Sequence, residues 1–123
     1  MFAVRYTGTM ADTDVHEIEH PSILVRVRQA ARKRILYLPH AVRQMARCDR
    51  MISVSEVREV VLAGLVIEDY PEDQRGHSCL LLGRGEGGRV VHVVCSPKTE
   101  YLAIITAYLP DDEQWSTDFK RRR

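Results

Sequence analysis

The sequence predicts an α+β domain in which N-terminal helices are followed by a four-stranded antiparallel sheet. Apolar residues recur at helical spacing between residues 22 and 63, and capping residues mark where the helices begin. After Gly64 the apolar residues form strand-like runs, which glycine, proline and acidic residues separate. The chain has 123 residues, of which 45% are hydrophobic, and this suffices for one core. We therefore expect a single domain over residues 22–123.

Residues 1–21 carry a polar mixture without a sustained period, and we expect them to form an N-terminal extension. The chain has no uninterrupted apolar run of about 20 residues, which a membrane span needs, and no start typical of a secretory signal. Its three cysteines are odd in number and far apart, which favours reduced thiols. We therefore expect a soluble cytoplasmic protein without membrane contact.

The helical part begins at Ser22, which can cap a first helix that runs to about Lys33. Its expected buried residues are Ile23, Val27, Ala30 and Ala31. Residues 35–38 are a crossing segment or a brief strand. Ser53 and Glu56 form a capping box at the start of a later helix, and Gly64 predicts a left-handed terminus for it. That helix is expected to bury Val57, Val60 and Val61.

Pro39 begins a helix between these two, and its polar residues His40, Arg43 and Arg47 share one face. An imidazole beside two permanent cations can hold a phosphate and move a proton. The alternative is a solvated face opposite a buried stripe. That stripe is expected to contain Val42, Met45 and Ala46.

Four strands are expected over residues 65–70, 78–84, 89–96 and 101–109. The glycines of residues 85–88 supply the positive backbone angles of a hairpin turn, and the turn lacks the residues of a phosphate-binding loop. If His92 pairs with Ile104, Tyr108 lies on the same sheet face as His92. Trp115 and Phe119 are four residues apart, which predicts a last helical turn that packs both rings on the domain.

The formal net charge of +1 hides a basic block between residues 21 and 50. Such a block attracts polyanions such as RNA, although it is also typical of a solvated helix face. Near balance over the whole chain argues against a ribosome-targeting toxin, because cation density drives binding to RNA. Against the single acid Asp49, the block contains Arg26, Arg28, Arg32, Lys33, Arg34, Arg43, Arg47 and Arg50.

The order of several separated motifs resembles a bacterial family catalogued as domain of unknown function 4258, over about residues 22–123. That family is similar to the RelE and ParE group of small toxins, several of which are endoribonucleases neutralised by an antitoxin. The motifs are Pro39-His40-Ala41 with Arg43, Met45 and Arg47; Ile52-Ser53 with Glu56-Val57; residues 66–71; residues 80–83; residues 91–94; and residues 104–108 with Trp115.

This resemblance implies a RelE/ParE-like fold, an antitoxin partner, and RNA or the ribosome as target. Metal-independent RNA cleavage needs groups that move protons, for which His40, His92 and Tyr108 are the candidates. It also needs cations on the phosphate, for which Arg43, Arg47 and Arg121 are the candidates.

Other readings of the chain stay open. A strand histidine is more often a packed residue, Tyr108 can be a half-buried sheet residue, and terminal arginines are usually a solvent tail. The whole domain can also be a non-catalytic module that binds protein or nucleic acid, or a toxin relative without activity. The His77/Cys79 and His92/Cys95 pairs lack zinc-site spacing, so we expect no metal and no cofactor.

Overall fold

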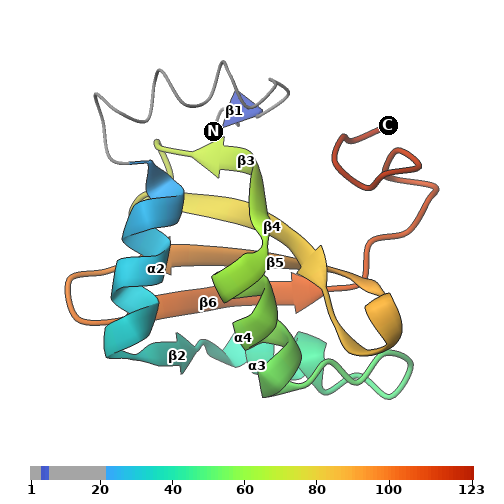
Figure 1. Ribbon diagram of the computed structural model, residues 1–123, viewed down its shortest axis with the longest axis horizontal. Coiled ribbons are helices and arrows are strands. Elements are labelled where there is room, and N and C mark those ends of the chain that lie inside the picture. Colours follow the sequence, from blue (N-terminus) through green and yellow to red (C-terminus); the bar gives the residue numbers. More distant parts are fainter. Residues whose placement is uncertain (1–3, 6–21) are drawn as a thin grey trace.

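The structure, a computed structural model, describes residues 4–5 and 22–123 and confirms the α+β class (Figure 1). Its sheet has six strands in the order β1-β3-β4-β5-β6-β2. The strands are β1 (Val4–Arg5), β2 (Ile35–Tyr37), β3 (Leu65–Tyr70), β4 (Ser78–Arg84), β5 (Val90–Pro97) and β6 (Leu102–Tyr108). The helices are α2 (Ile23–Lys33), α3 (Pro39–Met45), α4 (Val54–Ala63) and the short 3-10 turn η1 (Glu86–Gly88).

The prediction of four antiparallel strands is wrong in two respects. β2 adds to the sheet in parallel with β6, so the short apolar segment before α3 is an edge strand and the sheet is mixed. β1 pairs antiparallel with β3 at the opposite edge, although the sequence places it within the expected N-terminal extension. The rest of that extension, residues 1–3 and 6–21, lies outside the described residues.

Both long helices begin where their capping residues predict. Ser22 accepts a hydrogen bond from Val25 N, and Ser53 and Glu56 complete their capping box. The predicted buried residues of α2 and α4 are also buried. The left-handed terminus at Gly64 is wrong, because its φ is −78°. Glycine is required there for space: a Cβ would lie 2.5 Å from the Val60 carbonyl oxygen and 2.6 Å from that of Leu82.

The middle helix buries one of the three residues expected, Met45, and exposes the other two. Ala41 and Met45, four residues apart, are buried in the core, whereas Val42 and Ala46 are exposed. α3 packs against β6, and an (i, i+4) pair suffices for a contact on so short a helix. The sequence pattern misplaced this face by about one residue.

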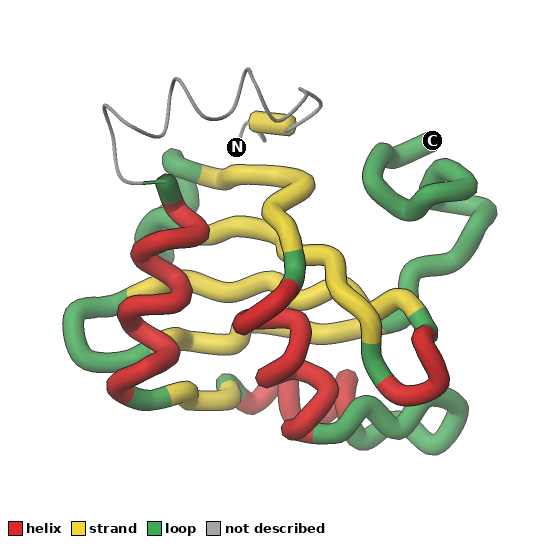
Figure 2. Tube along the Cα trace, in the orientation of Figure 1, coloured by secondary structure: helices red, strands yellow, loops and turns green. Residues whose placement is uncertain are grey.

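The sheet separates two groups of apolar side chains. The larger group packs the buried faces of α2, α3 and α4 against one side of the sheet, where Figure 2 shows the helices. On the other side, the C-terminal segment after β6 covers a smaller group that contains Ile67, Leu80, Leu82 and Trp115. The predicted helical turn from Trp115 to Phe119 is wrong, because Trp115 forms an isolated β-bridge with Arg122. Both rings nevertheless pack on this group, as expected. No helix in the described part of the chain is long and apolar enough to cross a membrane.

Two one-residue bulges decide which side chains face the C-terminal segment. In β3 the pairing with β4 shifts between Val66 and Glu68, and in β6 the pairing with β5 shifts across Ile105. Because side chains alternate along a strand, one extra residue transfers every later side chain to the other face. As a result, His92 pairs with Tyr108, whereas Ile104 pairs with Cys95. The pairing of His92 with Ile104, which was the condition for this grouping, does not occur, but His92 and Tyr108 do lie on one face.

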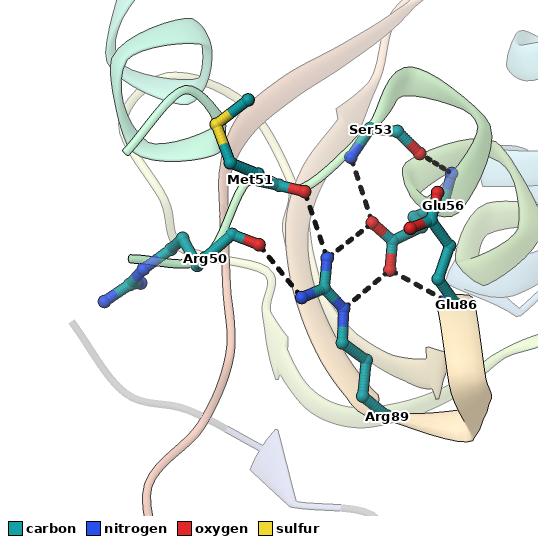
Figure 3. Close-up of polar contacts among 6 residues, drawn as sticks. All are labelled: Arg50, Met51, Ser53, Glu56, Glu86 and Arg89. Atoms are coloured by element: carbon teal, nitrogen blue, oxygen red, sulfur yellow. Dashed lines mark hydrogen bonds and ion pairs between the residues drawn. The ribbon is translucent and has the colours of Figure 1, made fainter. Parts of the chain in front are cut away.

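A buried ion pair fixes the loop before α4 to the hairpin between β4 and β5 (Figure 3). The Arg89 guanidinium donates to both carboxylate oxygens of Glu56, at 2.8 and 2.7 Å, and to the carbonyls of Arg50 and Met51. These bonds lower the pKa of Glu56 to about 2, with the Arg89 contact as the largest cause. These groups form hydrogen bonds with one another, so we assign the cluster a structural role.

Candidate functional site

The predicted site residues lie in two separate places. His40, Arg43 and Arg47 are exposed on α3 and just after it, and α3 belongs to the helix side of the sheet. Arg47 pairs with its neighbour Asp49, Nε to Oδ1 at 3.3 Å. His92 and Tyr108 lie on the opposite face, beneath the C-terminal segment. The structure therefore brings His92 and Tyr108 together but does not bring them to the α3 residues.

His92 is fully buried, and both its ring nitrogens have partners. Its Nε2 donates to the carbonyl oxygen of Phe119 at 2.9 Å, so Nδ1 is the acceptor for the Tyr108 hydroxyl at 3.2 Å. Trp115 stands edge-on to the imidazole, with ring centroids 4.5 Å apart. Burial lowers the pKa of His92 to about 4 and raises that of Tyr108 to about 12. At neutral pH both groups are uncharged. His92 is shielded from solvent, whereas Tyr108 is partly exposed.

An ion pair between Glu68 and Arg122 lies beside His92 and Tyr108. Glu68 is 1% exposed and accepts three hydrogen bonds from Arg122, at 3.0, 3.1 and 3.3 Å, and one from the Tyr70 hydroxyl. The Arg122 guanidinium also lies 4.7 Å from the centre of the Trp115 ring. Its neighbour Arg121 is exposed and is not part of this network. We call Glu68, Tyr70, His92, Tyr108, Trp115 and Arg122 the sealed cluster.

A cavity of about 520 Å³ lies between α2 and the loops after β3 and β5. This size lies within the usual range of ligand sites. Its lining has three permanent cations and a histidine but no acid, and Ala30 lies at its buried base. We call it the cationic cleft; it is lined by Arg26, Gln29, Ala30, Lys33, Gly76, His77, Pro97, Lys98 and Thr99.

His77 is the titratable group of this cleft, and its side chain is 25% exposed. Arg26 Nη1 lies 2.9 Å from His77 Nδ1, and a guanidinium can only donate, so Nδ1 is the acceptor. The other nitrogen, Nε2, therefore carries the proton and donates to Asp69 Oδ1 at 2.5 Å. A carboxylate on one ring nitrogen holds the imidazole in one tautomer and stabilises the imidazolium that forms when the other nitrogen takes a proton.

Two lysines complete the cationic wall. Lys33 donates to the carbonyl of Thr99 at 2.8 Å, and Lys98 donates to the carbonyl of Arg75. Gly76 makes room for this arrangement: its φ is +111°, and a Cβ would lie 2.6 Å from Lys98 Nζ. The cleft thus combines a histidine of fixed tautomer with three cations. Such groups can bind an anion and transfer a proton beside it.

Sequence reasoning missed this cleft. It noted His77 only in connection with zinc, and it counted Arg26 and Lys33 within the basic block without separating them from the other cations. Asp69 lies on β3 and His77 lies in the loop directly before β4, eight residues later, and the pairing of β3 with β4 brings them together. A sequence signal did exist, since a histidine follows the acid-rich loop of residues 71–76 at the start of a strand. Among the described residues, no three His, Cys, Asp or Glu side chains gather where they could hold a metal ion.

Comparison with known proteins supports one part of the predicted resemblance. No curated protein and no solved structure matches the chain. The family model described as domain of unknown function (DUF4258) matches residues 37–109, more than half of the chain. The matched region begins at Tyr37, runs through α3, α4 and β3 to β6, and includes Asp69, His77 and Lys98. The chain therefore belongs to the DUF4258 family.

Proposed function

We propose that this protein binds RNA in the cationic cleft and cleaves it without a metal ion, as a toxin of the RelE/ParE kind. In this proposal it acts in the cytoplasm on free or ribosome-bound RNA and is neutralised by an antitoxin protein. The observation that carries the proposal is the Asp69–His77 pair, 2.5 Å apart, in a cavity whose charged lining is cationic. The resemblance to DUF4258 and, through it, to RelE and ParE toxins supplies the choice of RNA.

In the proposed reaction, His77 Nδ1 takes the proton of a ribose 2′-hydroxyl once the substrate has displaced Arg26 from that nitrogen. The 2′-oxygen attacks phosphorus, the bond to the 5′-oxygen breaks, and this oxygen takes a proton from water in the open cleft. The products are a 2′,3′-cyclic phosphate and a 5′-hydroxyl. Asp69 stabilises the imidazolium, while Arg26 and Lys98 stabilise the added charge on the phosphate oxygens.

The low net charge of the chain does not prevent RNA binding if the cations are concentrated at one site. The Debye length is about 8 Å at physiological salt, so acids outside the cleft are largely screened from a phosphate inside it. Among the described residues, Arg26 and Lys98 line the cavity without an acidic partner, whereas Lys33 pairs with Glu100 at 3.9 Å. The acids of the 111–113 segment lie after β6. A chain with a net charge of +1 can therefore present a cationic site.

The deciding experiment compares the cationic cleft with the exposed surface of α3. Purified full-length protein is incubated with a mixed RNA pool in the presence of a chelator, and RNA ends are mapped. We expect cleavage that leaves cyclic phosphates and falls at least about 100-fold in His77→Gln. His40→Gln and Arg43→Gln are the matched controls, because both residues are exposed on α3 and were the first sequence candidates.

Each alternative outcome has a clear meaning. Loss of cleavage in His40→Gln or Arg43→Gln, with His77→Gln active, would move the site to α3. Cleavage that requires Mg²⁺ would contradict the proposed chemistry. Expression of the wild-type chain in bacteria should arrest growth, and His77→Gln should relieve the arrest if cleavage causes it.

The second candidate function is binding of nucleic acid without cleavage. It is favoured by the contact between Arg26 and His77 Nδ1, at 2.9 Å, because this contact occupies the nitrogen that would have to take the proton. Its signature is RNA binding that weakens in Arg26→Gln and Lys98→Gln while the RNA stays intact. Such a result would overturn the nuclease proposal and retain the cleft.

A further inference from the structure

The free edge of β2 is an unusual surface in this fold. β2 pairs with β6 on one side only, and no other strand of the described sheet lies beyond it. Figure 2 shows β2 at the margin of the sheet, between α2 and α3. Open edges present unpaired backbone groups and are potential sites for the addition of another strand.

The hydrogen bonds to β6 identify the backbone groups that point outward. The Arg34 carbonyl accepts from Leu102 N at 2.8 Å, and Leu38 N donates to the Ile104 carbonyl at 3.0 Å. In a parallel pair alternate residues bond to the partner strand, so Leu36 also faces β6. The amide and carbonyl groups of Ile35 and Tyr37 therefore face away from the sheet. They offer two donors and two acceptors to an added strand.

Cations flank these groups on both sides. Arg34 precedes β2, Arg43 lies on α3 after it, and both are exposed. Within residues 22–123 neither side chain is in an ion pair, whereas Lys33, Arg47, Arg75, Arg89 and Arg122 each have an acidic partner. Leu38 and Val42 add exposed apolar surface, 37% and 51% accessible. The edge thus combines backbone groups, apolar contact and positive charge.

We propose that the free edge of β2 is the docking site for an extended acidic segment of a partner protein, which adds a strand to the sheet. Charge selects this occupant. A second copy of the chain would bring the same cations face to face across the edge, and like charges repel. An acidic strand instead brings carboxylates to Arg34 and Arg43 while its backbone pairs with Ile35 and Tyr37. This inference does not depend on the RNA cleft.

The test uses the full-length protein and a short acetylated peptide that alternates valine and glutamate. We expect amide exchange at Ile35 and Tyr37 to slow by at least about tenfold when the peptide is added, since both amides become hydrogen-bonded. Leu36, whose amide is already bonded to β6, should not change. An acidic peptide of equal length and charge that is interrupted by proline cannot pair as a strand and should give no protection.

A charge-reversal pair of variants tests the electrostatic part. The double variant Arg34→Glu/Arg43→Glu should bind the peptide at least about tenfold more weakly, whereas Arg84→Glu/Arg121→Glu makes the same charge change away from β2 and should bind normally. Absence of protection in the wild-type chain at saturating peptide overturns the proposal, as does equal binding of the proline peptide. Protection that rises with protein concentration alone would assign the edge to a second copy instead.

Discussion

Two histidines of this fold show how differently one residue type can be used. His92 is fully buried, its two nitrogens are bound to Tyr108 and to the Phe119 carbonyl, and its pKa is lowered to about 4 by burial. His77 is partly exposed in the cationic cleft, with Asp69 on one nitrogen and the side chain of Arg26 on the other. Arg26 is exposed and can be displaced by a ligand, whereas the Phe119 carbonyl moves only with the C-terminal segment.

The two histidines therefore have different expected roles: His92 in stability and His77 in chemistry. A substrate reaches His92 only if the C-terminal segment leaves the sheet, which breaks the Glu68–Arg122 ion pair and exposes Trp115. His77 needs only the movement of one side chain. A catalytic role for His92 and Tyr108 stays a prediction, and it carries this added requirement. We expect changes in the sealed cluster to lower the free energy of unfolding and changes in the cationic cleft to alter ligand binding.

The largest effect is expected for Trp115→Ala. The ring is 2% exposed, contacts His92 and lies beneath Arg122, so its removal opens a cavity in the sealed cluster. We expect the free energy of unfolding to fall by about 3–5 kcal/mol in denaturant titrations. Val42→Ala is the control, because Val42 is exposed and should change stability by less than about 0.5 kcal/mol. A loss below about 1 kcal/mol for Trp115→Ala would show that the C-terminal segment does not seal the sheet.

The next effect is the pH dependence that His92 contributes. Its folded pKa, about 4, lies below the ordinary value of 6.5, so between these values the unfolded chain binds more protons and stability rises with pH. The contribution is complete above about pH 6.5 and is lost as pH falls to 4, in total about 3 kcal/mol. Unfolding of the wild type and of His92→Gln across this range measures it. Equal slopes for the two proteins would contradict the depressed pKa.

Adjacent arginines provide a sharper comparison. Arg122→Ala leaves the buried carboxylate of Glu68 without its guanidinium, and we expect a loss of about 2–3 kcal/mol, reduced from that of a fully buried pair because Arg122 is half exposed. Arg121→Ala removes an exposed side chain and should change stability by less than about 0.5 kcal/mol. Thermal unfolding of the two variants measures the difference. Equal effects of the two substitutions would show that Arg122 contributes only its charge at the C-terminus and not a specific ion pair with Glu68.

Much of the helical part followed from sequence. Capping at Ser22 and Ser53 and the buried stripes of α2 and α4 were predicted, because local hydrogen bonds and a 3.6-residue period determine them. The strand positions were also close. The α+β class follows from this order of elements.

What failed depends on distant parts of the chain. The bulge at Ile105 has no local signature, yet it sets His92 opposite Tyr108. A basic C-terminus is typical of a solvent tail, and the carboxylate partner of Arg122 lies 54 residues earlier in the sequence, so this contact could not be predicted locally. The Asp69–His77 pair likewise needs the register of two strands. Residue chemistry was readable from the sequence, but the contacts that select which histidine is accessible were not.

The smallest stability effect is expected at the cleft, and it completes the comparison. His77→Gln removes a ring that is 25% exposed but keeps an N–H that can donate to Asp69, so the free energy of unfolding should change by about 1 kcal/mol or less. If RNA binding or cleavage falls sharply in a variant this stable, the loss cannot be attributed to unfolding. A large destabilisation would instead place His77 with His92 among the structural histidines, because it would mean that Asp69 and Arg26 hold the loop of residues 71–77 through this ring. Denaturant titration of His77→Gln beside His92→Gln distinguishes these outcomes, and only the first leaves the cleft as a site for chemistry.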